Sequence, residues 1–120
     1  DNVSTIPVDW ANAYFSYQEK HIGWEGALWT DEAIREFLSE FYPWFLPDFD
    51  SYPYSIQRVD AARYFILYHY GGIYFDLDIG TVKSLETLRV AVSAKGAMFP
   101  ITDPVGLSND VMAASPKHPF

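Results

Sequence analysis

Two aspartates, Asp76 and Asp78, stand two positions apart at the end of an apolar run and have the chemistry of a metal site. In an extended strand, residues at i and i+2 point to the same face, with Cα atoms about 6.5 Å apart. Carboxylates at this spacing suit Mg²⁺ or Mn²⁺, with one acid binding the cation directly and the other acting through water or a ligand hydroxyl. A cation held there would neutralise a diphosphate and stabilise it as a leaving group.

An Asp-x-Asp triplet is a weak signal by itself in a chain this rich in aspartate. A second triplet, Asp48-Phe49-Asp50, is an internal comparison, and we interpret it as exposed loop acids because prolines surround it and no strand precedes it. Asp76 and Asp78 differ because a buried strand leads into them. On spacing alone, the simpler interpretation that they only terminate a strand at the surface stays open.

The elements that would position these acids are a long helix and the strand after it. The sequence predicts a helix over residues 55–70, ended by a pair of glycines, which readily adopt the left-handed conformation that closes a helix. The alternating run that follows predicts a strand over residues 73–78, with Tyr74, Asp76 and Asp78 on one face. A helix, a tight turn and a buried strand ending in acids indicate an α/β fold, in which ligands bind beyond the carboxyl ends of strands.

Asp60 and Arg63 on the predicted helix place charge near the same region. They are i, i+3 neighbours and lie on one side of the helix. Because this helix leads into the acidic strand, its polar side is expected to border the same cleft. An ordinary exposed ion pair is the alternative interpretation.

The rest of the chain is predicted to alternate between helices, short strands and a packed loop. Thr30 is a capping residue, followed by acids in a first helical turn and by apolar residues at helical spacing. The further predicted elements are a helix over 8–20, a strand over 27–29, a helix over 31–41, a packed loop over 43–53, a helix over 85–91, a strand over 97–99 and a helix over 108–114.

Composition excludes several classes of protein. Sixteen acidic residues against eight basic ones give a net charge of −8, which argues against a nucleic-acid partner because phosphate contacts need clustered Lys and Arg. Nine Phe, nine Tyr and four Trp are too much apolar surface for a disordered tail. There is no cysteine, so thiolate sites and disulfides are excluded. The 120 residues suffice for one domain, and no run of about 18 apolar residues predicts a membrane span in them.

A longer string is far more specific than the triplet. Residues 55–78 read SIQRVDAARYFILYHYGGIYFDLD, and this string resembles the Asp-x-Asp glycosyltransferases that include the fungal initiating α-1,6-mannosyltransferase and the catalytic subunits of mannosyl inositol phosphorylceramide synthase. The large clostridial glucosylating toxins share the same core pattern. LWTDE at 28–32 matches an upstream element of the family. TDPVGLSNDVM at 102–112, followed by HPF at 118–120, resembles the sphingolipid mannosyltransferase branch.

The resemblance implies a GT-A fold, a Rossmann-like α/β sheet that binds a nucleotide sugar through a divalent metal. By this resemblance, residues 1–120 form one partial domain, incomplete at both ends. The family's first strand, expected ahead of Pro7, is missing, as is the acceptor side expected after Phe120. We therefore expect a fragment that is not active alone.

The resemblance also assigns roles to single residues. Asp60 and Arg63 match positions that contact the nucleotide and donor sugar, and Tyr74 matches an aromatic residue near the nucleotide. Asp76 matches the acid that reaches the ribose or donor sugar beside the metal, and Asp78 matches the direct metal ligand. Both are therefore the candidate catalytic residues.

Asn109 and Asp110 match a loop that borders the sugar. The family retains the anomeric configuration without an identified protein nucleophile, so no general base is assigned. Arg63 and the metal would stabilise the charge of the departing nucleoside diphosphate.

The function expected from the resemblance is transfer of mannose from GDP-mannose to inositol phosphorylceramide, with Mn²⁺ or Mg²⁺ as cofactor. The expected location is the Golgi membrane, with the catalytic domain in the lumen and membrane association through segments outside this chain. The expected partners are a nucleotide sugar, a lipid or glycan acceptor and a regulatory membrane subunit.

Three other functions remain as alternatives. One is a protein- or polysaccharide-directed sugar transferase of the same family, and another is a non-catalytic nucleotide-sugar-binding remnant. The third is a haloacid-dehalogenase-type phosphatase, whose nucleophile motif is Asp-x-Asp-Gly-Thr. Ile79 shifts Gly80 and Thr81 by one position from that motif, which would misplace the hydroxyl.

Overall fold

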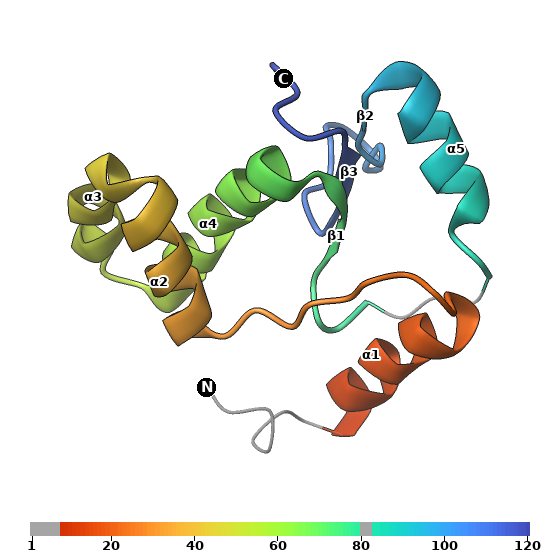
Figure 1. The fold of residues 1–120 in the computed structure, drawn as a ribbon, viewed down its shortest axis with the longest axis horizontal. Helices are drawn as coiled ribbons and strands as arrows, with labels where there is room; N and C mark the ends of the chain where they lie inside the picture. The colour runs from red at the N-terminus through yellow and green to blue at the C-terminus, as the bar shows by residue number, and fades with distance from the viewer. Residues whose placement is uncertain (1–7, 80–82) are drawn as a thin grey trace.

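The computed structural model describes residues 8–79 and 83–120, which fold into helices around a small sheet (Figure 1). The mixture of elements agrees with the predicted α/β class. In chain order the elements are α1 (Val8–Lys20), α2 (Asp31–Phe41), the 3₁₀-helix η2 (Pro43–Phe45), α3 (Leu46–Ser51), α4 (Ser55–Tyr70), β1 (Gly72–Phe75), α5 (Glu86–Lys95), β2 (Ala97–Met98) and β3 (Val111–Ala114).

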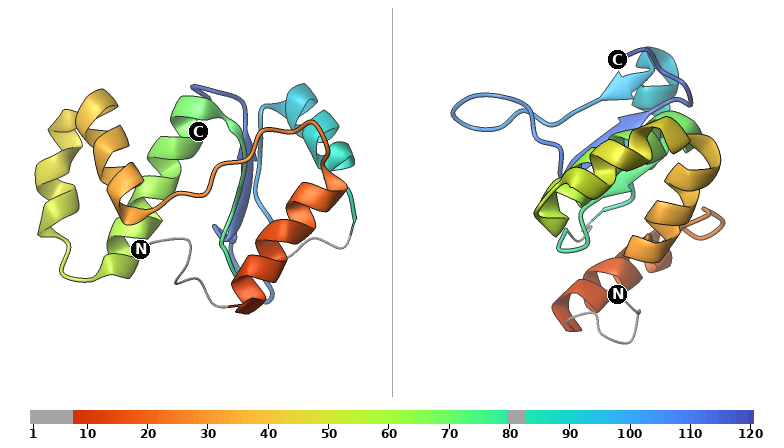
Figure 2. Two further views of the ribbon diagram at one scale, coloured as in Figure 1. Left: turned by 60° about the horizontal axis from the view of Figure 1, so that its bottom comes forward. Right: turned by 90° about the vertical axis from the view of Figure 1, so that its left-hand side faces the viewer.

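The sheet lies between two layers of helices. Its strand order is β1-β3-β2, and β3 is antiparallel to both neighbours. Helix α4 packs against β1 and β3 on one side, and α5 packs against β2 and β3 on the other (Figure 2, left). Helix α1 lies on the α5 side, where Tyr17 stacks on Phe75 with 4.3 Å between ring centroids. Strand β1 is therefore covered on both faces.

A cluster of helices supports α4 from its far side. Thr30 Oγ1 accepts a hydrogen bond from the Ala33 N–H at 3.1 Å, which caps α2 as predicted. The apolar face of α2 then packs on η2, α3 and α4. The buried residues of this core are Ile34, Phe37, Leu38, Phe45, Phe49, Ala62 and Ile66. A second cluster of Leu67, Met112 and Ala114 joins α4 to the sheet, so the position of α4 is fixed from both sides.

Three predicted elements are wrong. Residues 27–29 form no strand, and the predicted loop over 43–53 contains η2 and α3. The segment predicted as a helix over 108–114 instead forms β3, the central strand. Its alanines and methionine favour helices in isolation, but pairing on both edges and burial of residues 112–114 override that preference.

The strand predicted over 73–78 ends earlier than expected. Strand β1 stops at Phe75, and the Ile79 N–H donates to the Asp76 carbonyl at 3.0 Å, which closes a turn. Asp76 is the first residue of that turn, and Asp78 lies within it. The two aspartates are therefore presented by a turn at the carboxyl end of β1.

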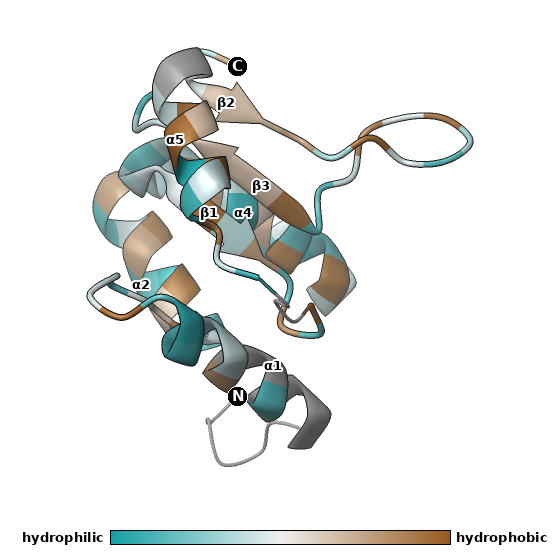
Figure 3. Cartoon of the chain, turned by 90° about the vertical axis from the view of Figure 1, so that its right-hand side faces the viewer, coloured by the Kyte–Doolittle hydropathy of each residue, from teal (hydrophilic) through white to brown (hydrophobic). Residues whose placement is uncertain are grey.

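The connection between β2 and β3 projects from the molecule and returns to this end of β1 (Figure 3). Ile101 and Leu107 form an isolated antiparallel bridge, and the Thr102 N–H donates to the Gly106 carbonyl at 3.0 Å. The loop therefore brings Asn109 and Asp110 back beside the sheet. None of the helices in the described part of the chain is long and apolar enough to cross a membrane.

Replacing Gly71 with alanine is expected to lower the free energy of unfolding by about 2–3 kcal/mol. Gly71 ends α4 with a φ of +67°, and a Cβ there would lie 2.5 Å from Pro116 Cδ. Denaturant unfolding of the full-length protein would measure the change. Gly26→Ala is the control, because open space surrounds its Cβ position, and it should change stability by less than about 1 kcal/mol. Equal stability of the two variants would contradict the role of Gly71.

Candidate functional site

The guanidinium group of Arg63 is the centre of the candidate site. Its side chain lies on the buried side of α4 and is only 3% exposed. Nη2 pairs with Asp60 Oδ1 at 2.5 Å, and Nη1 pairs with Asp76 Oδ1 at 2.9 Å. Nη1 also donates to the Asn109 carbonyl at 2.7 Å. One buried cation therefore joins α4, the end of β1 and the loop before β3.

Tyr74 completes the surroundings of this cation. The Arg63 Cζ lies 5.0 Å from the centroid of the Tyr74 ring, and the Tyr74 hydroxyl donates to Asp76 Oδ1 at 3.2 Å. Tyr74 and Asp76 thus lie together as predicted, although Asp76 follows the strand instead of belonging to it. Arg63 Nε is buried and lacks a hydrogen-bond partner among the described residues. Buried hydrogen-bond donors without a partner are unusual in folded proteins, so we expect a water or ligand atom to accept a hydrogen bond from Arg63 Nε.

Antiparallel pairing of β1 with β3 brings the predicted loop residues to the same place. The Asp76 N–H donates to the Asp110 carbonyl at 2.8 Å, and the Ser108 hydroxyl bonds the Asp110 carboxylate. Asn109 Nδ2 donates to the Tyr64 hydroxyl at 3.3 Å. The residues predicted from sequence that the structure brings together are Asp60, Arg63, Tyr74, Asp76, Asn109 and Asp110.

Asp78 is outside this hydrogen-bond network, although it follows Asp76 by only two residues. Its side chain is exposed, and its charge contributes to raising the pKa values of Asp76 and Tyr17. Asp76 has one oxygen engaged by Arg63 and Tyr74, and Asp78 follows it by two residues with an exposed side chain. The site therefore presents carboxylate oxygen toward solvent.

The donor set fits a divalent cation that shares its coordination with a ligand. Over residues 8–79 and 83–120, no three His, Cys, Asp or Glu residues cluster as a metal site. Mg²⁺ is commonly bound through one or two carboxylates, with phosphate oxygens and water as the remaining ligands. Asp78 and Asp76 supply such a pair, and hard oxygen ligands also suit Mn²⁺.

Electrostatics at the site favour an added positive charge. Burial raises the pKa of Asp76 above its ordinary value, although the Arg63 guanidinium acts in the opposite direction. The charge of Asp78 makes a smaller contribution to the rise. A cation bound between Asp76 and Asp78 would favour their ionised forms.

The Tyr74 phenol is expected to ionise late. Burial is the main reason its pKa rises to about 12, and the Asp76 carboxylate adds to the effect. Because the folded pKa exceeds the unfolded value near 10, the stability that the neutral phenol contributes is full below about pH 10 and is lost as the pH rises toward 12. Ultraviolet titration of the natural protein minus that of Tyr74→Phe should show a midpoint near pH 12. A midpoint near 10 would contradict the buried placement.

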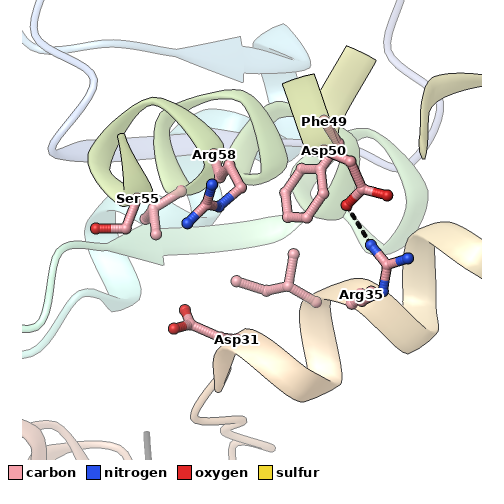
Figure 4. A pocket seen from close by; sticks show the side chains of 8 residues that line it. Asp31, Arg35, Phe49, Asp50, Ser55 and Arg58 are labelled. Carbon is pink, nitrogen blue, oxygen red and sulfur yellow. Dashed lines mark hydrogen bonds and ion pairs between the residues drawn. The ribbon is translucent and has the colours of Figure 1, made fainter. Parts of the chain in front are cut away.

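The second Asp-x-Asp triplet lies elsewhere, and its acids are exposed as predicted, although on α3 rather than in a loop. Asp50 forms an ion pair with Arg35 (Figure 4). Arg58 Nη1 donates to the Tyr52 carbonyl at 2.9 Å. The pairs flank a cavity of about 200 Å³ lined by Asp31, Ile34, Arg35, Phe49, Asp50, Ser55, Arg58 and Val59. This cavity holds none of the predicted site residues.

Sequence reasoning missed Tyr64, Tyr17 and His21. Tyr64 bonds Asn109. Tyr17 of α1 and His21, just after α1, bond Ile79 and Leu85, which both follow Asp78 in the chain. No spacing signal links them to the site, because their partners lie 45 to 64 positions away in the chain. The Gly80 and Thr81 positions that bear on the phosphatase alternative lie outside the described residues.

Comparison with known proteins identifies the family. The profile of the glycosyltransferase sugar-binding region containing the DXD motif matches residues 7–94. The chain belongs to this glycosyltransferase family. The matched residues include α4, β1 and the turn after β1, and so contain five of the candidate site residues: Asp60, Arg63, Tyr74, Asp76 and Asp78.

Curated relatives of this glycosyltransferase chain are similar over nearly all of its length. Inositol phosphoceramide mannosyltransferase 1 of Schizosaccharomyces pombe is 53% identical over 118 residues, which cover 96% of this chain and 36% of the relative. Mannosyl phosphorylinositol ceramide synthase SUR1 of Saccharomyces cerevisiae is 47% identical over 115 residues, covering 96% of this chain and 29% of the relative. The chain thus spans about a third of these relatives' lengths.

A more distant relative is similar over a smaller share of the chain. The uncharacterized glycosyltransferase L373 of Acanthamoeba polyphaga mimivirus is 34% identical over 82 residues, which cover 68% of this chain and 33% of the viral protein. No solved structure matches the chain.

Proposed function

We propose that this chain is the donor-binding part of a retaining mannosyltransferase that moves mannose from GDP-mannose to inositol phosphorylceramide. One observation carries the proposal: buried Arg63 gathers the Asp60 and Asp76 carboxylates at the open end of β1, next to exposed Asp78. The named activities of the fungal relatives, on inositol phosphoceramide, support the choice of sugar and acceptor.

In this proposal the residues around Arg63 bind and orient the donor. Asp60 and Arg63 contact the nucleotide and the donor sugar, and Tyr74 lies near the nucleotide. The pairing of Arg63 with both carboxylates fixes their positions before the donor arrives. Asn109 and Asp110 border the sugar from the loop that precedes β3.

Asp78 binds the divalent cation directly, and Asp76 reaches the donor beside it. When bound, Mn²⁺ or Mg²⁺ would neutralise the diphosphate and stabilise it as the leaving group. Arg63 adds a fixed positive charge near the same group, and its burial strengthens its electrostatic effect. Asp76 and Asp78 are thus the proposed catalytic residues.

The remaining parts of the proposal concern the whole protein. Residues 1–120 would be one part of a GT-A domain whose catalytic side faces the Golgi lumen. Membrane association would come from segments outside this chain, and a regulatory membrane subunit is a proposed partner.

Lipid labelling tests the proposed acceptor. Membranes containing the full-length protein would be incubated with radiolabelled GDP-mannose, Mn²⁺ and inositol phosphorylceramide, followed by thin-layer chromatography. The expected result is a mannosylated inositol phosphorylceramide that forms with the natural protein and is absent with Asp78→Asn. Label in protein or polysaccharide would favour the other acceptors of the same family. Donor binding without any transfer would favour a non-catalytic module.

A further inference from the structure

Tyr17 of α1 and His21, the residue that follows this helix, bind the chain at and after the end of the acidic turn, residues 76–79. The Tyr17 hydroxyl donates to the Ile79 carbonyl, immediately after Asp78. One helical turn later, His21 Nε2 accepts a hydrogen bond from the Leu85 N–H at 2.7 Å. Helix α1 and the residue that follows it thus fix the positions of Ile79 and Leu85.

Tyr17 also fixes the entry to the turn. Its ring stacks on Phe75, the last residue of β1, with 4.3 Å between centroids and 25° between ring planes. The Asp76 N–H is bonded to the Asp110 carbonyl, and the Ile79 N–H to the Asp76 carbonyl. Asp78 is exposed, so its position depends on the backbone turn that carries it. Tyr17 touches that turn at its beginning and at its end.

Both ring nitrogens of His21 make hydrogen bonds to backbone groups. Its side chain is buried, at 7% exposure, against the Trp24 ring. Nδ1 lies 2.7 Å from the Tyr17 carbonyl, and Nε2 faces the Leu85 N–H. A carbonyl needs a donor and an N–H needs an acceptor, so these contacts select the neutral ring with its proton on Nδ1. His21 therefore ties the Tyr17 backbone to the chain that leaves the acidic turn.

We propose that Tyr17 and His21 are positioning residues for Asp78, and that they set the affinity of the site for its divalent cation. The inference rests on the proposed function, because it takes Asp78 as the direct metal ligand. Groups that orient a ligand residue without touching the metal commonly change metal affinity by about 10- to 100-fold. Tyr17 and His21 act through the backbone, so we expect about 3- to 10-fold for each.

A purely structural role would give a different pattern. If α1 only covered the sheet, loss of one hydroxyl would lower stability and leave metal affinity alone. Tyr17→Phe keeps the ring that stacks on Phe75 and removes the donor to Ile79. His21→Gln keeps an acceptor for the Leu85 N–H, whereas His21→Ala removes it.

Binding of Mn²⁺ to the full-length protein in the presence of GDP tests this inference. Electron paramagnetic resonance would measure free Mn²⁺, and thermal unfolding would be followed in parallel. Tyr17→Phe and His21→Ala are expected to weaken Mn²⁺ binding about 3- to 10-fold, and His21→Gln to bind within about twofold of the natural protein. The controls are Tyr70→Phe, which removes a hydroxyl from an exposed α4 residue, and Glu19→Ala on the exposed side of α1; neither should change binding.

The outcomes separate the two proposals. If the natural protein binds Mn²⁺ and Tyr17→Phe binds it equally well, the positioning role is wrong and the proposed function stands. Equal losses in Tyr17→Phe and in the controls would also refute positioning, because they would reflect general destabilisation. If the natural protein takes up no Mn²⁺ with GDP, the proposed function fails and the positioning role fails with it.

Discussion

Replacing Asp78 with asparagine is expected to lower kcat/KM for mannose transfer by about a thousandfold. Asparagine keeps the size of the side chain but removes the charge that would hold the cation at the open end of β1. Without the cation, the leaving diphosphate would lose its main source of charge stabilisation, while Arg63 would remain in place. Initial rates at low donor concentration in the presence of Mn²⁺, measured with the full-length protein in membranes, would give the change in kcat/KM.

The chain offers a matched control for this substitution. Asp48→Asn changes the first acid of the other Asp-x-Asp triplet, whose side chain is exposed on α3. Its rate should equal that of the natural protein. Similar losses from both substitutions, or full activity of Asp78→Asn, would show that Asp78 has no special role.

Loss of the Arg63 side chain is expected to destabilise the fold by about 3 kcal/mol. Arg63→Ala would leave the partly buried Asp76 carboxylate without its cation and the Asn109 carbonyl without its donor. It would also remove the polar link that joins α4 to the end of β1 and to the loop before β3. Denaturant unfolding of the full-length protein, followed by tryptophan fluorescence, would measure the change.

Two further variants serve as controls for the loss of stability expected in Arg63→Ala. Arg35→Ala breaks an ion pair whose side chains are both about half exposed, so it should cost less than about 1 kcal/mol. Arg63→Lys keeps the charge but cannot reach three acceptors from one planar group, so we expect an intermediate loss. If Arg63→Ala were no more destabilising than Arg35→Ala, the central placement of Arg63 would be wrong.

The helices were predictable because their signals are local. Thr30 with the acids after it marked the start of α2, and the glycine pair marked the end of α4. These devices act within a few residues and need no distant partner. Strand β3 was not predictable in the same way, since its residues favour a helix until β1 and β2 pair with them.

In the candidate site, too, the features set by local sequence were predictable, and those that depend on distant residues were not. Alternation along β1 correctly placed Tyr74 with Asp76, and helical spacing correctly paired Asp60 with Arg63. The burial of Arg63 was not predicted, because it depends on covering by the loop before β3. Asp78 was expected on the strand, whereas the hydrogen bond from Ile79 to Asp76 places it in a turn.

Calorimetric titration of GDP-mannose into the full-length protein tests the central claim most directly, namely that Asp76 and Asp78 bind a nucleotide sugar through a divalent cation. We expect GDP-mannose to bind the natural protein in Mn²⁺ and to lose that binding in excess EDTA. We expect Asp78→Asn to bind GDP-mannose in neither condition. Binding of equal strength with and without metal, or by Asp78→Asn in Mn²⁺, would contradict the central claim.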